Sequence, residues 1–116
     1  MKIKTFLEQL SQHPDQIEFT DTMAVIEANY DFTSSSFVNG KTVNEVGTND
    51  GSCKIFAFGL LNKLSEQQTL ACFGRYYRDD VLANPNGDDH QNIRNFMVTG
   101  WSGINFESNV LAPQPQ

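Results

Sequence analysis

The sequence contains no long hydrophobic run. No stretch approaches the roughly 18 consecutive apolar residues that a membrane-spanning helix needs. The opening segment, MKIKTFLEQLSQ, also lacks the uninterrupted apolar stretch of a secretion signal, because Glu8 and Gln9 interrupt it. We therefore expect a cytoplasmic protein with no membrane partner.

Basic residues are scarce as well. Eight Lys and Arg stand against fourteen Asp and Glu, which gives a net charge of -6 and an isoelectric point of about 4.6. Nucleic acid and anionic membranes repel such a chain at long range. The aromatic and basic segment RYYRDD, residues 75–80, ends in two aspartates that neutralise its arginines. The composition therefore predicts no nucleic-acid partner.

Cysteine and histidine are equally rare, with two residues of each. Two cysteines without a signal peptide are typical of free thiols in a reducing compartment. Cys53 and Cys72 lie on consecutive predicted helices, about 6 Å apart along the helix axes, and a disulfide does not tolerate that offset. No CxxC pair occurs, and the Cys and His spacings match no zinc motif. We therefore expect no metal and no cofactor.

The chain is rich in aromatic residues, with nine Phe, three Tyr and one Trp among its 116 residues. A chain of this length buries roughly 65 to 70% of its unfolded surface without staples. We therefore expect a single compact domain over residues 1–112, followed by a frayed tail at 113–116.

Apolar periodicity predicts a mainly helical domain. The predicted helices cover residues 3–12, 21–29, 53–64, 65–81 and 88–99. Asp21 is expected to cap the second helix, Ser65 and Gln68 have the spacing of a capping box for the fourth, and Asp88 or Asp89 is expected to cap the fifth. Gly100 is the expected end of the fifth helix.

Residues 35–46 have the composition of a strand or loop, with Asn39 and Gly40 suited to a tight hairpin turn. The predicted fold class is therefore mainly α within an α+β domain of about five helices, with a short β-hairpin or irregular strand segment between the second and third helices. An all-α domain is the alternative. The helix from Cys53 is apolar on nearly all sides, which predicts that it lies at the centre with Phe56 and Leu60 in the core.

The stretch GTNDGSCKIFAFG, residues 47–59, has two interpretations. A glycine-rich approach to a helix binds anions, and a cysteine in the first turn beside Lys54 acquires a depressed pKa. However, the glycine spacing misses the phosphate-loop pattern, and Lys54 is followed by Ile55 rather than Ser or Thr. Asp50 or Ser52 is sufficient to cap the helix. We favour a structural role and expect the Cys53 thiol to face inward.

Two other segments concentrate polar groups. Asp89, His90 and Arg94 share one face of the fifth predicted helix, and RYYRDD carries Arg75 and Arg78 near aromatic rings. Both patterns fit ligand or partner binding, and both fit solvated helix faces with local ion pairs. No catalytic residue is assigned. The residues predicted as candidates for ligand binding are Cys53, Lys54, Arg75, Arg78, His90 and Arg94.

Four long segments resemble the HopJ type III effector protein family. They are EFTDTMAVIEANYDFT (18–33), VNEVGTNDGSCKIFAFG (43–59), LSEQQTLACFGRYYRDDVL (64–82) and DDHQNIRNFMVTGW (88–101). The resemblance covers about residues 3–112 and implies an association with type III secretion in plant-pathogenic bacteria. It implies no enzymatic activity and no catalytic residue.

Two functions remain open at this stage. The first is a non-catalytic domain that binds another protein, with secretion through a type III system implied by the resemblance. The second is a small-ligand-binding protein or enzyme that uses polar residues around Cys53, His90 and Arg94. A deep pocket lined by those residues favours the second function, and a flat surface favours the first.

Overall fold

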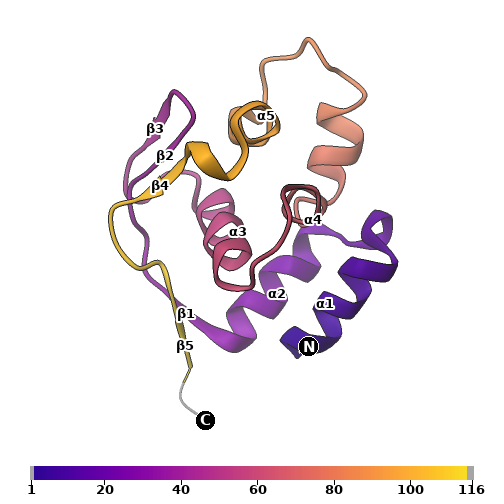
Figure 1. Ribbon diagram of the computed structural model, residues 1–116, viewed down its shortest axis with the longest axis vertical. Coiled ribbons are helices and arrows are strands. Elements are labelled where there is room, and N and C mark those ends of the chain that lie inside the picture. The colour runs from indigo at the N-terminus through magenta and orange to yellow at the C-terminus, as the bar shows by residue number, and fades with distance from the viewer. Residues whose placement is uncertain (1, 115–116) are drawn as a thin grey trace.

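The computed structural model describes residues 2–114 and shows a helical domain with two small antiparallel sheets at one side (Figure 1). The α-helices are α1 Ile3–Gln12, α2 Phe19–Asn29, α3 Asp50–Leu61, α4 Glu66–Ala71 and α5 Gln91–Thr99. Two 3-10 helices, η1 Pro14–Gln16 and η3 Gly100–Gly103, and a π-helix, η2 Tyr76–Val81, complete the helical part. The predicted α+β class is confirmed, and the all-α alternative is wrong.

The predicted hairpin is present, with its turn one residue later than expected. β2 Phe37–Asn39 pairs with β3 Thr42–Asn44, and the turn consists of Gly40 and Lys41. Gly40 has a φ of +61°, which the turn requires and which other residues adopt at a cost. Asn39 instead ends the first strand, where its side chain is buried.

The remaining strands bring distant parts of the chain together. β4 Ile104–Phe106 pairs with β2, so the first sheet has the order β3-β2-β4. β1 Tyr30–Phe32 pairs with β5 Leu111–Pro113 in the second sheet. After β5, the backbone N–H of Gln114 donates a hydrogen bond to the carbonyl of Asn29 at the end of α2. β5 ends at Pro113, one residue after the predicted domain end at 112, and Pro115 and Gln116 lie outside the described residues.

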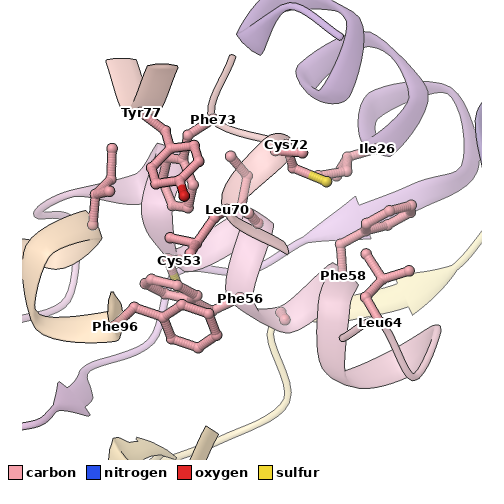
Figure 2. Packing of buried hydrophobic residues seen from close by; sticks show 14 of the residues in the cluster. Ile26, Cys53, Phe56, Phe58, Leu64, Leu70, Cys72, Phe73, Tyr77 and Phe96 are labelled. Carbon is pink, nitrogen blue, oxygen red and sulfur yellow. The ribbon is translucent and has the colours of Figure 1, made fainter. Parts of the chain in front are cut away.

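α3 lies at the centre of the domain, as predicted (Figure 1). Figure 2 shows Phe56 beside Phe96 in the core, and their ring centroids are 5.0 Å apart. Ile55 and Phe58 are also fully buried, as expected for a helix that is apolar on nearly all sides. The core position predicted for Leu60 is wrong, since its side chain is 46% exposed. The helix begins at Asp50 and ends at Leu61, so its last turn emerges from the core.

The starts of α2 and α5 correct two predicted caps. Asp21 is the third residue of α2, where it accepts a hydrogen bond from the Glu18 backbone N–H at 3.0 Å in a capping box. α5 begins after His90, and neither Asp88 nor Asp89 caps it. The loop before α5 contains a turn at Asn84–Gly87, in which the Gly87 backbone N–H donates to the Asn84 carbonyl at 3.0 Å. The predicted stop at Gly100 is also confirmed.

The predicted fourth helix is interrupted. Its Ser65 cap is confirmed, because the Ser65 hydroxyl accepts from the Gln68 backbone N–H at 3.1 Å. The helix then breaks at Gly74, which has a φ of +61°, and the chain continues as the π-helix η2. A Cβ atom at Gly74 would lie 2.6 Å from the backbone nitrogen of Phe19. The close approach of α2 therefore requires glycine here, and it sets the position of η2.

Candidate functional site

Cys53 lies inside the core. Its residue is fully buried, and its Sγ atom points to the carbonyl of Ser35 at 3.8 Å. Burial raises the pKa of the Cys53 thiol. Cys72 is also free and buried, and burial raises its pKa to about 12. The thiolate form of both residues is therefore disfavoured at neutral pH, which makes them poor nucleophiles.

Lys54 and the arginines of RYYRDD are engaged in separate contacts. The Lys54 ammonium lies 4.8 Å from the ring centre of Phe32 and 4.0 Å from Glu27. Arg75 and Arg78 both approach the carboxylate of Glu18 at 3.3 Å. Arg78 also donates to the carbonyl of Ile17 at 2.8 Å. These arginines therefore attach η2 to the start of α2.

Arg94 stabilises the turn before α5. It donates to the Asn84 carbonyl at 2.9 Å and pairs with the Asp89 carboxylate at 2.5 Å. The hydrogen bond from Arg94 holds the pKa of Asp89 below its usual range. Asp89, His90 and Arg94 thus lie close together, as the sequence predicts. However, the guanidinium of Arg94 is already bonded to groups of the turn before α5.

His90 lies at the edge of a polar cleft. Its Nε2 atom is 3.0 Å from the Asp80 carboxylate, and its ring centre is 5.2 Å from that of Tyr76. Both partners belong to η2, and π-helical turns occur often at functional sites. The sequence did not indicate Asp80 or Tyr76 as partners of His90, because the contact depends on the fold of residues 82–89. We call this cavity the His90 cleft.

The His90 cleft has a volume of about 360 Å³ and lies where η2, the hairpin and the starts of α3 and α5 meet. Phe19, Phe73 and Tyr76 contribute aromatic surface. The polar lining consists of Thr42, Asn44, Asn49, Ser52, His90, Gln91 and Asn92. The lining contains no Lys, Arg, Asp or Glu. Of the six candidate residues predicted from the sequence, His90 alone lines this cleft.

A network of asparagine side chains forms one wall of the cleft. Asn92 donates to the Asn44 side-chain oxygen at 2.9 Å, and Asn44 donates in return to the Asn92 oxygen at 3.1 Å. Asn49 and Asn39 donate to the same two oxygens at 2.7 and 3.0 Å. Such a network fixes the side chains that take part in it. The network joins the hairpin to the starts of α3 and α5. No local sequence signal indicates this connection.

Backbone strain is concentrated at the same place. Asn49 and His90 precede α3 and α5 with φ values of 52° and 51°, and neither side chain caps its helix. Within residues 2–114, one other non-glycine residue, Lys63, has a positive φ. Strained residues of this kind are retained where the surrounding structure holds them, and they often occur at functional sites.

A second surface feature lies between the end of η2 and α5. We call it the α5 groove; it has a volume of about 210 Å³ and is lined by Val81, Leu82, Pro85, Arg94, Met97 and Val98. Val98 is 84% exposed, and Leu82 and Met97 are about half exposed. The groove thus presents large apolar side chains to solvent.

The structure adds two negative findings for residues 2–114. No cluster of three or more His, Cys, Asp or Glu side chains is arranged to hold a metal ion. No helix in this part of the chain is both long and apolar enough to span a membrane.

Comparison with known proteins identifies the family. The model of the HopJ type III effector protein family matches residues 3–111. A crystal structure described as that of unknown function protein VPA0580 is 60% identical in sequence and has a TM-score of 0.97. The similarity covers 98% of this chain and 95% of that one. A search of curated proteins gives no match. The chain therefore belongs to the HopJ type III effector protein family.

Proposed function

We propose that this HopJ-family chain is a non-catalytic domain that binds another protein at the α5 groove. The observation that carries the proposal is the group of exposed apolar side chains around the groove, Leu82, Met97 and Val98. Contiguous exposed apolar surface is typical of interaction sites, because its burial against a partner removes it from water.

The segments of chain that form the groove also carry acidic residues, which favour a basic partner. Asp79 lies on η2 and Asp88 on the loop before α5, and both are exposed. Neither carboxylate has an ion-pair partner within residues 2–114. Arg94 lines the groove, but Asp89 neutralises it. A suitable partner is an amphipathic helix that places apolar side chains in the groove and Lys or Arg at its flanks.

The competing function requires Cys53, His90 and Arg94 to share one ligand site. Cys53 is buried in the core, and Arg94 lines the α5 groove rather than the His90 cleft. That combination therefore has weaker support than protein binding. The family description adds type III export to the proposal: the domain would be made in the bacterial cytoplasm and bind its partner after secretion.

A peptide titration tests the proposal. The probes are two short amphipathic peptides with the same leucine face, one carrying lysines and the other glutamates. We expect the leucine-lysine peptide to bind saturably and to shift the NMR amide signals of Leu82, Met97 and Val98. We expect the leucine-glutamate peptide to bind much more weakly, because the chain has a net charge of -6.

Two valine variants provide a matched comparison. Val98→Ser removes an apolar side chain from the groove, whereas Val43→Ser removes one from β3, where the valine is 69% exposed. We expect only the first to weaken binding of the leucine-lysine peptide. Equal effects of the two variants, or peptide shifts that map away from α5, would contradict the proposed function.

A further inference from the structure

We propose that the His90 cleft binds a small uncharged saccharide, with the Tyr76 ring as the surface on which the sugar ring stacks. This site is separate from the α5 groove and does not depend on the proposed protein binding. Its volume of about 360 Å³ falls within the range of roughly 300 to 1,000 Å³ that is common for small-molecule pockets.

The charge of the lining favours an uncharged ligand. The lining contains no Lys, Arg, Asp or Glu. Lys54, Arg75, Arg78 and Arg94 are all paired with carboxylates elsewhere, and Asp80 and Asp89 lie within 4 Å of the His90 ring nitrogen. An anion in the cleft would therefore lack a basic side chain and meet nearby carboxylates. A cation would find no carboxylate in the lining, and the nearby Asp80 and Asp89 already contact His90 and Arg94.

The aromatic residues provide a stacking surface. The ring centre of Tyr76 is 5.1 Å from that of Phe19 and 5.2 Å from that of His90, so the three rings form a continuous series. Tyr76 remains partly exposed, and it lines the cleft. An exposed aromatic ring with a polar tip suits a ligand that has an apolar face and a polar edge. A pyranose ring has this character.

The polar groups of the cleft residues that have no protein partner suit a ligand rich in hydroxyl groups. Within residues 2–114, no protein partner is found for Asn49 Oδ1, Ser52 Oγ, Tyr76 Oη or His90 Nδ1. In the neutral tautomer whose Nε2–H donates to the Asp80 carboxylate, Nδ1 is an acceptor. Sugar hydroxyl groups can donate to these acceptors and also accept from the two protein hydroxyl groups.

The asparagine network keeps this site in place before a ligand arrives. Asn44 and Asn92 are buried and use their amide groups to bond each other. Asn49 is held through Asn44, so its remaining oxygen has a fixed position. A site whose groups are already ordered loses less entropy on binding than a mobile one.

An NMR titration of the ¹⁵N-labelled chain tests this inference. The probes are methyl α-glucopyranoside, methyl β-galactopyranoside and N-acetylglucosamine, with inorganic phosphate and adenosine as comparison ligands. We expect at least one saccharide to produce saturable shifts at Asn49, Ser52 and Gln91, with smaller effects from phosphate and adenosine. Tyr76→Ala should weaken saccharide binding by about tenfold, because it removes the stacking surface.

Matched variants separate this site from the groove. Tyr76→Phe keeps the ring and should weaken saccharide binding less than Tyr76→Ala. Val98→Ser should leave saccharide binding unchanged, and Tyr76→Ala should leave binding of the leucine-lysine peptide unchanged. The inference is overturned if none of the three saccharides gives saturable shifts. It is also overturned if phosphate or adenosine binds more tightly than every saccharide. The same holds if Tyr76→Ala does not change saccharide affinity while its NMR spectrum shows that the variant is folded.

Discussion

The core around Phe56 and the His90 cleft meet at the first turn of α3. Apolar packing stabilises the core, whereas hydrogen bonds between amide side chains stabilise the cleft. Cys53 faces a core of aromatic and aliphatic side chains, whereas the preceding residue, Ser52, lines the cleft. The core is apolar and closely packed, and the cleft combines amide side chains with two strained residues, Asn49 and His90. The comparison shows that the part of α3 that stabilises the fold is distinct from the part that offers binding groups.

The largest effect is expected from Phe56. Its ring lies near those of Phe37, Phe73, Phe96 and Trp101. Phe56→Ala should lower the free energy of unfolding by about 3 to 5 kcal/mol, because it leaves a cavity. Denaturant unfolding measures this change, with Leu60→Ala as the control on the exposed end of the same helix. A loss below about 1 kcal/mol for Phe56→Ala would show that α3 is not the centre of the core.

Gly74 follows Phe73, a core residue that also lines the cleft, at the point where the predicted helix breaks. Gly74→Ala should lower the free energy of unfolding by more than about 2 kcal/mol. The alanine would have to keep a positive φ, and its Cβ would clash with the Phe19 backbone. Gly47→Ala is the control, since Gly47 has a φ of +83° but no atom within 4 Å of the position that a Cβ would take. Denaturant unfolding of both variants separates the clash from the strain. Equal losses would mean that close packing at Gly74 is unimportant.

The cleft should respond to the loss of one amide. Asn92→Ala removes three buried side-chain hydrogen bonds, one between Asn92 and Asn39 and two between Asn92 and Asn44. We expect a loss of about 1 to 3 kcal/mol in unfolding free energy. The control is Asn105→Ala at an exposed position of β4, which should change the free energy of unfolding by less than about 0.5 kcal/mol. Similar values for both variants would show that the network does not hold the cleft together.

The smallest effect separates strain at the cleft from strain elsewhere. Lys63 is exposed and has a φ of 54°, so Lys63→Gly should raise the unfolding free energy by about 1 kcal/mol. His90→Gly relieves the same strain but loses the contacts with Asp80 and Tyr76. Its gain in thermal or denaturant stability should therefore be smaller. An equal gain would show that these contacts contribute nothing to stability.

Local signals in the sequence predicted the core well. Periodicity located α1 and the central α3, and the spacing of Ser65 and Gln68 identified the cap of α4, because these features depend on residues within one or two turns. Four residues of the predicted fourth helix are buried, although that helix is interrupted at Gly74: Leu70, Phe73, Tyr77 and Val81. The break depends on the approach of α2, which periodicity does not contain.

The cleft could not be predicted in the same way. Its groups come from the hairpin, η2 and the starts of α3 and α5, and they meet through contacts between residues as far apart as Asn39 and Asn92. The chemistry of a histidine makes His90 a candidate from the sequence alone, but its contacts with Asp80 and Tyr76 depend on the path of the loop between η2 and α5. The pairing of β1 with β5 was missed for the same reason.

Thiol labelling at two consecutive positions tests most directly the claim that Cys53 belongs to the core while its neighbour faces the cleft. In the native wild-type protein at neutral pH, Cys53 and Cys72 should react with a thiol reagent only after unfolding, because burial raises both pKa values. Ser52→Cys should add one thiol that is labelled in the folded state at a rate close to that of an unstructured peptide. If native Cys53 is labelled as fast as the peptide, and phosphate protects it, the start of α3 is a reactive anion site and the account is wrong.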